Sequence, residues 1–403
     1  KTQSHAYFIA PSNKESIRLK LLLKHQNAGA GWILAQKDME LRGSGNIFGI
    51  EQSGHAFDVG LDTLNLFSGT GIRIEAGVDA HGHKSLTFAT TDEAGDYYAN
   101  YYYWDPSSNK YEVNRGTQVF LGSMAGSTGQ KTGAVAIGWQ AGTQNQGSYS
   151  VAIGYQAGMT QQSNQSIAIG YQSAIQSQGN NSISIGYQAG QTQQGTQSIA
   201  IGYQTAIKSQ GTNSISIGYQ AGMTQQSDKS IAIGYQSAIQ SQSNLAIAIG
   251  YSAGSNVQSS ETVAIGYQAG QYTQQYQSIA LGVNAGQTSQ GTLSIAIGSS
   301  AGSLSQGVNS IAVGYQAGLN IQNSGSIAVG YLAGQTQQGT QSIAIGYQAG
   351  ILNQGANSIS IGSYAGATGQ NNNAISVGYQ AGQQYQSLNS IAIGNNAGNY
   401  SQG

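Results

Sequence analysis

The chain has 403 residues, of which 7% are charged, with a net charge of −1, 59 glycines, two prolines and no cysteine. Disulfides are therefore excluded, and stability must come from burial and stacking. No run of about 18 apolar residues could span a bilayer. Beyond residue 121 the charged residues are few, so electrostatic binding of nucleic acid or of an anionic membrane is not expected there; they are Lys131, Lys208, Asp228, Lys229 and Glu261.

Residues 1–62 differ in composition from the rest, because they hold 13 of the 29 charged residues. Residues 16–26 (SIRLKLLLKHQ) and 31–40 (GWILAQKDME) are interpreted as two short helices. The glycines at 43, 45 and 49 do not form a dinucleotide-binding fingerprint, since the third falls one place late. We expect a short α-helical N-terminal segment.

Within this segment, "HAYFIAP" followed by "AGAGWILAQKDMELRGSGNIFGIEQSGHAFDVGLD" covers residues 5–62. It resembles the region after the ATPase motor of bacterial transcription-repair coupling factors. The resemblance implies that Arg42 and Gln52 belong to a motif coupling ATP hydrolysis to movement on DNA. No phosphate-binding GxxxxGK[ST] loop exists in the chain, so we expect a fused fragment rather than a working translocase.

Residues 63–116 are predicted to be a small β-rich cap or connector that covers the open edge of the repeats beginning at residue 117. They contain His81-Gly82-His83, whose side chains would point the same way on a strand. Two ligands per chain are too few for a closed metal site. The segment resembles the His-x-His sites of trimeric phage fibres, where three chains would supply six ligands; the alternative is a solvated loop, and no cofactor is otherwise expected.

Residues 117–403 are a repeat array. A glycine recurs every 16 residues from Gly122 to Gly394, which gives 18 copies, because 272 is 17 × 16. An apolar-small-apolar triplet precedes each glycine, and strict alternation is typical of a strand. A fixed period of this kind predicts a solenoid. The fold class is therefore all-β, a parallel β-solenoid of 18 coils, about 86 Å long at ~4.8 Å per coil.

The two aliphatic residues of each triplet are predicted to lie inside the coil as an apolar ladder. The small residues would then line the outside, where they would allow a neighbouring sheet to pack closely. This outer set is Ser166, Ala168, Ser182, Ser184, Ala200 and Ala232.

A glutamine stands eight residues after the glycine in all 18 copies. We interpret it as an internal ladder in which each amide bonds to the next; recent duplication is the alternative. The residues singled out are Gln146, Gln162, Gln178, Gln194, Gln210 and Gln226.

A tyrosine directly follows the glycine in 12 copies. Rings ~4.8 Å apart can stack, so this row either reinforces the corner or offers a contact surface to a partner or glycan. The residues singled out are Tyr155, Tyr171, Tyr187, Tyr203, Tyr219, Tyr235, Tyr251 and Tyr267.

The motif "SIAIGYQAG" over residues 117–403 resembles the "SIAIG" repeats of trimeric autotransporter adhesin heads and similar arrays in phage and large-virus fibres. The resemblance implies a homotrimer displayed extracellularly, on a cell or virion surface, with a host receptor or glycan as ligand. An ice-binding solenoid is an alternative, although Gln176 and Lys208 interrupt the column of Thr160, Thr192 and Thr224. A second alternative is an accessory protein of a DNA translocase.

No enzyme is expected, because all five histidines precede residue 84 and the serines of the array have no base. The start at Lys1 and the end within a coil, at residues 401–403, indicate a piece of a longer protein.

Overall fold

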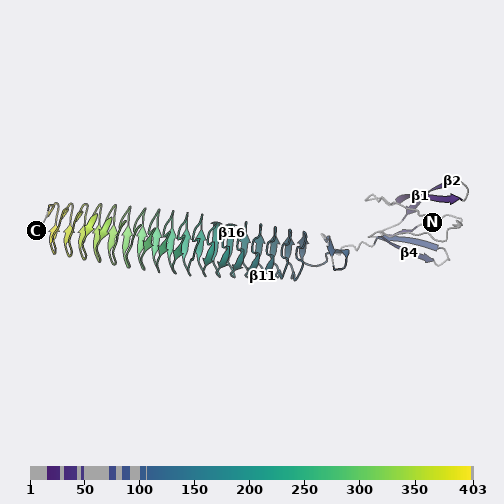
Figure 1. Cartoon of the computed structure of the whole chain (residues 1–403), viewed down its shortest axis with the longest axis horizontal. Coiled ribbons are helices and arrows are strands. Elements are labelled where there is room, and N and C mark those ends of the chain that lie inside the picture. The colour runs from purple at the N-terminus through teal and green to yellow at the C-terminus, as the bar shows by residue number, and fades with distance from the viewer. Residues whose placement is uncertain are drawn as a thin grey trace. The chain divides into compact units, whose positions relative to one another are not determined.

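The computed structural model describes residues 100–105 and 107–400 and, nearer the N-terminus, the backbone of five strands. The chain divides into two compact units, Lys1–Arg115 and Gly116–Gly403 (Figure 1). Every regular element in the described residues is a β-strand. The chain is thus all-β and its larger unit is a parallel β-solenoid, which confirms the predicted fold class for the repeats.

The two helices predicted in the N-terminal segment are wrong. The strand β1 (Ser16–Asn27) pairs antiparallel with β2 (Gly31–Arg42) as a long hairpin. Leu19, Leu21 and Leu23 alternate with polar residues, and this period of two is the strand pattern. The 12-residue ladder between the strands prevails over the helix propensity of leucine and lysine.

The same sheet continues through β3 (Ile47–Gly49), β5 (Lys84–Thr90) and β4 (Ile72–Val78), in the order β1-β2-β3-β5-β4. The pairing of β3 with β5 joins residues on both sides of position 62. A separate hairpin comes next along the chain, β6 (Tyr102–Asp105) with β7 (Lys110–Val113), where Ser107 donates two hydrogen bonds to Asp105 in the turn. The domain limits at 62/63 and 116/117, and the capping role of 63–116, stay predictions.

The solenoid is built on two sheets, and the first contains 18 strands paired in register at intervals of 16 residues. Its strands are β8 (Val119–Leu121), β9 (Val135–Ile137), β10 (Val151–Ile153), β12 (Ile167–Ile169), β14 (Ile183–Ile185), β16 (Ile199–Tyr203), β18 (Ile215–Tyr219), β20 (Ile231–Ile233), β21 (Ile247–Ile249), β23 (Val263–Ile265), β25 (Ile279–Leu281), β27 (Ile295–Ile297), β28 (Ile311–Val313), β29 (Ile327–Val329), β31 (Ile343–Ile345), β33 (Ile359–Ile361), β34 (Ile375–Val377) and β35 (Ile391–Ile393).

The second sheet lies across the coil and is more interrupted, with isolated bridges linking its parts. Its strands are β11 (Thr160–Gln162), β13 (Gln176–Gln178), β15 (Thr192–Gln194), β17 (Lys208–Gln210), β19 (Thr224–Gln226), β22 (Val257–Gln258), β24 (Thr273–Gln274), β26 (Ser289–Gln290), β30 (Thr336–Gln338) and β32 (Leu352–Gln354). In Figure 1 the coils, with β16 and β11 labelled on the two sheets, succeed one another in a single row.

The glycine at each corner is required by the backbone. Its φ lies between 121° and 133° in all 18 copies, a region essentially closed to other residues. A Cβ at Gly154 would lie 2.5 Å from the carbonyl oxygen of Gly170, the next corner glycine. Each corner therefore packs directly on the corner of the next coil, which sets the repeat of the solenoid.

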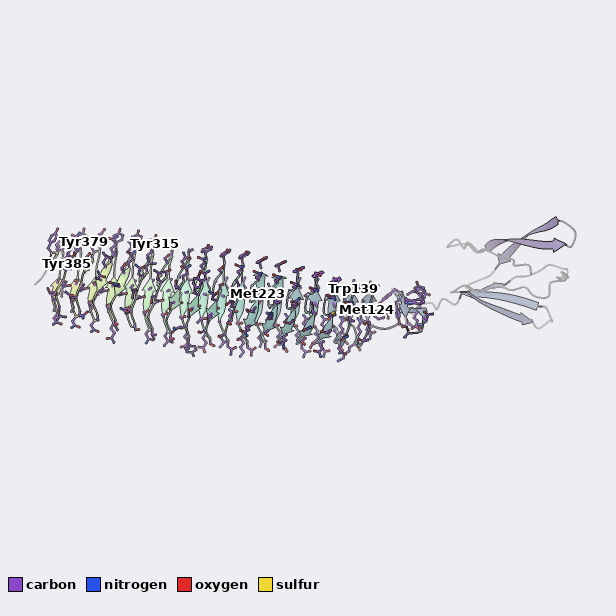
Figure 2. All side chains as sticks on the ribbon, in the orientation of Figure 1. Met124, Trp139, Met223, Tyr315, Tyr379 and Tyr385 are labelled. Atoms are coloured by element: carbon purple, nitrogen blue, oxygen red, sulfur yellow. The ribbon has the colours of Figure 1, made fainter. Side chains whose placement is uncertain are left out.

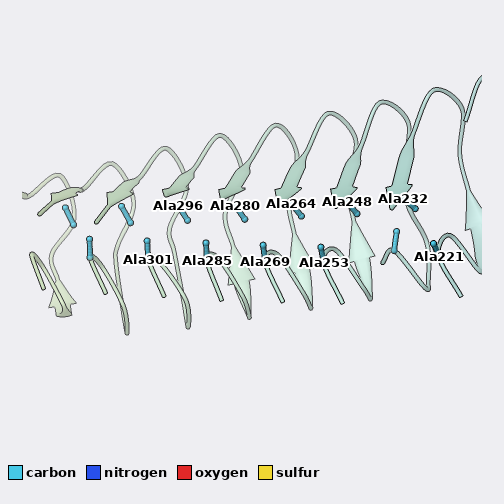
Figure 3. Packing of buried hydrophobic residues seen from close by; sticks show 14 residues of the cluster. Ala221, Ala232, Ala248, Ala253, Ala264, Ala269, Ala280, Ala285, Ala296 and Ala301 are labelled. Atoms are coloured by element: carbon cyan, nitrogen blue, oxygen red, sulfur yellow. The ribbon is translucent and has the colours of Figure 1, made fainter. Parts of the chain in front are cut away.

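The interior is made of alanine, which reverses the predicted assignment of the two faces. The middle residue of each first-sheet triplet, such as Ala200, is fully buried, whereas the flanking Ile199 and Ile201 are only partly covered. Ser166 and Ser182, also predicted outside, are buried too. Figure 3 shows the alanines of the first sheet (Ala232 to Ala296) pointing toward those of the opposite wall, labelled Ala221 to Ala301.

The width of the coil explains this reversal. A Cβ on Gly158 would lie 3.3 Å from the Cβ of Ala152 and 2.6 Å from the Oε1 atom of Gln162. The walls are thus already in contact through methyl groups and one amide side chain. No space remains for isoleucine, because interiors are close-packed and overpacking is destabilising.

Candidate binding surfaces

An aliphatic face covers the outside of the first sheet. It consists of the first and third residues of all 18 triplets, from Val119 and Leu121 to Ile391 and Ile393, and every one is Ile, Val or Leu. Ile297, Ile345 and Ile361 remain 36–38% exposed although a coil lies on either side. Contiguous apolar surfaces of this extent mark interaction sites in soluble proteins.

A tyrosine column runs beside this face, at the first corner. It consists of Trp139 followed by eight tyrosines, with ring centroids 4.7–5.1 Å apart and interplanar angles of 4–18°. The tyrosines are 39–47% exposed. They are the eight singled out from the sequence: Tyr155, Tyr171, Tyr187, Tyr203, Tyr219, Tyr235, Tyr251 and Tyr267.

Val283 and Ser299 interrupt the row, and a second, shorter stack joins Tyr315, Tyr331 and Tyr347. Tyr315 and Tyr379 are seen along the upper edge of the coils in Figure 2. The column thus presents ring edges and phenol hydroxyls to solvent at a spacing of one coil.

An outer amide ladder next to the column was not anticipated. The glutamine after each tyrosine donates from Nε2 to the Oε1 atom of the equivalent glutamine one coil back, at 2.9–3.1 Å. These residues have φ near +53° and could have been found from the recurrence of Gly-Tyr-Gln. They are Gln140, Gln156, Gln172, Gln188, Gln204, Gln220 and Gln236.

The internal glutamines, eight residues after each corner, lie inside the coil. From Gln146 to Gln386 each is at most 3% exposed and donates from Nε2 to the carbonyl oxygen of the first aliphatic residue of the preceding triplet. For Gln194 the acceptor is Ile183, at 2.8 Å. The amide therefore connects the second turn to the first sheet across the interior.

Contacts from one internal glutamine to the next occur only in part of the row. Seven such bonds of 3.0–3.4 Å join neighbours, as from Gln226 to Gln242 at 3.1 Å. Where the triplet has a central serine, its hydroxyl donates to Oε1 instead, as from Ser184 to Gln194 at 2.6 Å. In other coils, including those of Gln162 and Gln178, Oε1 has no hydrogen-bond partner.

The outside of the second sheet is mixed. Thr160 pairs with Gln176, and Thr192 with Lys208, so the threonine column is interrupted as the sequence indicates. Ser177, Ser209 and Ser241 each donate to the glutamine one coil back at 3.1–3.2 Å. The regular threonine array that an ice-binding face would present is absent from this described sheet.

Two tyrosines outside the tyrosine column have perturbed acidity. The pKa of Tyr347 is raised above its ordinary value, mainly by its hydrogen bond with Tyr364. The pKa of Tyr276 is raised by desolvation and by the Glu261 carboxylate, whose Oε1 atom accepts its hydroxyl proton at 3.3 Å. Both shifts favour the neutral phenol.

Several residues singled out from the sequence lie elsewhere. His81 and His83 are outside the described residues, as is Gln52, while Arg42 ends strand β2. In the described part, no three His, Cys, Asp or Glu side chains gather as metal ligands. A search of the same part finds no helix with the length and apolarity to cross a membrane.

These features define a class: a charge-poor parallel β-solenoid with an alanine core and one exposed aliphatic face. Comparison with known families agrees with the resemblance seen in the repeats. Residues 130–157, 163–189 and 289–317 match the YadA head domain repeat (2 copies). The array therefore carries YadA head repeats, a family whose members are typically trimeric adhesins of the cell surface.

A short partial match to transcription-repair coupling factors is also confirmed. The chain is 42% identical over 65 residues to the factor of Mycobacterium bovis and likewise to that of Borreliella burgdorferi, which is 15% of this chain and 5–6% of those proteins. A chloroplastic ATP-dependent DNA helicase of Arabidopsis thaliana is 40% identical over 65 residues, 15% of this chain and 8% of the helicase. The chain thus spans less than a tenth of these relatives. No solved structure matches.

Proposed function

We propose that this protein is a structural surface fibre of the adhesin type, in which the solenoid assembles as a homotrimer and presents a repetitive binding surface outside a cell or on a virion. The observation that carries the proposal is the aliphatic face, unbroken over 18 coils and partly exposed in the single chain. The match to YadA head repeats supports both the trimer and the surface location.

The energetics favour burial of the aliphatic face. Full burial of one Val, Leu or Ile side chain contributes about 1.5–3 kcal/mol, so covering the remaining third contributes about 0.5–1 kcal/mol. Summed over 36 positions, this exceeds the ~4–15 kcal/mol cost of association. Three copies around an axis would bring these faces together in a common core.

The second corner and the second sheet would then remain outside, together with the phenol edges of the tyrosine column. Phenols and amides repeating every coil are donors and acceptors suited to a receptor or glycan with many hydroxyl groups. The low charge of the array favours recognition by hydrogen bonds and apolar contact over electrostatic attraction.

Light scattering on the full chain tests the assembly. The expected mass is three times the 41.7 kDa of one chain. The triple variant Ile199→Asp, Ile215→Asp and Ile231→Asp should lower the mass to that of one chain and retain the β-sheet circular dichroism.

The matched control places three carboxylates in the same part of the array, on the second sheet, as Gln193→Asp, Ser209→Asp and Gln225→Asp. These positions are exposed and left-handed, a conformation that aspartate tolerates. This control should keep the mass of the wild-type protein. A wild-type protein with the mass of one chain at micromolar concentration would refute the assembly.

A further inference from the structure

We propose that the tyrosine column is a site of oxidative cross-linking, in which tyrosines of successive coils couple to dityrosine and fasten each coil covalently to the next. Seven consecutive Tyr–Tyr pairs in the column have centroids 4.8–5.1 Å apart and interplanar angles of 4–13°. Nothing in the proposed adhesin role requires this reaction, and it stands independently of that role.

Proximity favours coupling within one chain. Each phenol in the interior of the column has an identical ring on either side, held by the parallel pairing of the strands below it. The local concentration of the partner far exceeds that of a second molecule at micromolar concentration. The open side of the column, with tyrosines 39–47% exposed, admits an oxidant and lets the rings tilt to form the new bond.

The coupling reaction balances in electrons and atoms. Each of two neighbouring phenols loses one electron and one proton and becomes a phenoxyl radical. The radicals join through the ring carbons ortho to their oxygens, and the proton on each of these carbons moves through solvent to the oxygen as aromaticity returns. One C–C bond forms and two C–H bonds break. Hydrogen peroxide, acting through a haem peroxidase, accepts the two electrons and two protons and becomes two waters.

The cross-link would supply what the composition lacks. The chain has no cysteine, so no disulfide can tie one coil to another. A dityrosine between Tyr187 and Tyr203 would join residues 16 apart and prevent the hydrogen-bonded coils from separating locally. Resistance to proteolysis should therefore rise after oxidation.

The test treats the full chain with a haem peroxidase and hydrogen peroxide. Dityrosine is detected by its fluorescence, and the linked residues are identified by mass spectrometry after proteolysis. The expected products join tyrosines 16 residues apart, lose two hydrogen atoms per link, and migrate as single chains in denaturing electrophoresis.

Two variants with four Tyr→Phe changes each separate adjacency from tyrosine content. The alternating variant changes Tyr171, Tyr203, Tyr235 and Tyr267, and leaves no adjacent pair among the eight tyrosines. The block variant changes Tyr155, Tyr171, Tyr187 and Tyr203, and leaves three of the seven pairs, between Tyr219 and Tyr267. Phenylalanine retains the stacking in both.

Eight tyrosines can form at most four links, since each link uses two. The block variant should therefore keep up to two links from this column, and the alternating variant none. Equal dityrosine in the two variants at these positions would overturn the proposal. So would links that join only different chains, or an unmodified column in a protein whose other exposed tyrosines have reacted.

Discussion

The residue in the middle of each first-sheet triplet determines which side of the coil is inside. It is alanine or serine in 17 of 18 copies, and the exception, Phe120, stands in the first coil. Ala200 touches the interior with a methyl group and nothing larger fits there. The flanking isoleucines are left outside, where they are free to meet another chain.

Placing a carboxylate at these positions should separate folding from assembly. Ala200→Asp puts an unpaired charge into a closed interior and should lower the free energy of unfolding by several kcal/mol. Ile199→Asp should change that free energy by less than about 1 kcal/mol in a dissociated chain. Urea denaturation of both variants at low protein concentration measures this, and comparable losses would contradict the assignment of the faces.

The internal glutamine bonds to the backbone of the first sheet, and its loss should be felt there. Gln194→Leu removes the donor to the buried carbonyl of Ile183 and should cost about 1–3 kcal/mol. Gln188→Leu, in the outer amide ladder, is the control, because Leu332 occupies the equivalent left-handed position natively. Chemical denaturation should show less than about 0.5 kcal/mol for this change. A reversed order would mean that the outer ladder stabilises the coil.

At the scale of the coil, the two walls are matched in size. Where the central residue is Ser184, Ser216, Ser360 or Ser376, the residue six positions later is glycine, and where alanine follows, as at Ala174 and Ala206, the central residue is alanine. A Cβ at Gly190 would collide with the hydroxyl oxygen of Ser184. The walls therefore vary together within this one chain.

This matching predicts coupling between Ser184 and Gly190. Gly190→Ala alone should destabilise the coil by about 1–3 kcal/mol, through the collision and the left-handed backbone. Combined with Ser184→Ala, which reproduces the pair at Ala200 and Ala206, the loss should shrink by about 1 kcal/mol or more. A double-mutant cycle from thermal or urea unfolding measures the difference. Additive effects would show that the two walls do not meet at this point.

At the scale of the solenoid, the 18 strands of the first sheet are joined by 17 successive rises. At ~4.8 Å each, the array should be a rod of about 82 Å. Its five charged residues beyond Leu121 also mean that little in it titrates between about pH 5 and 9.

The unfolding temperature of the array should therefore be nearly constant over that range and fall in alkali. The pKa of Tyr347 is raised in the folded state, so the unfolded chain loses this proton first as the pH rises. The stability linked to this proton is fully present below the ordinary tyrosine pKa of 10.0 and is lost above it. Melting followed by the β-sheet signal at a series of pH values measures this. A transition near pH 6 would point to a contribution from outside the array.

The sequence by itself determined the repeat, the parallel solenoid, the corner glycines and the columns of tyrosine and internal glutamine. All of these result from periodicity, since residues 16 apart must occupy equivalent places once one coil stacks on the next. The period also located the aliphatic residues on one face of the strand, because alternation within Ile199-Ala200-Ile201 is a local property.

Only the tertiary structure decided which of the two faces is inside, because that depends on the distance between the walls and not on the pattern along either one. It also decided that the glutamines bond mainly to the first sheet, a choice among nearby acceptors. The N-terminal hairpin was settled in the same way: β1 is a strand because β2 pairs with it, and neither segment alone distinguishes that partner from a helical turn.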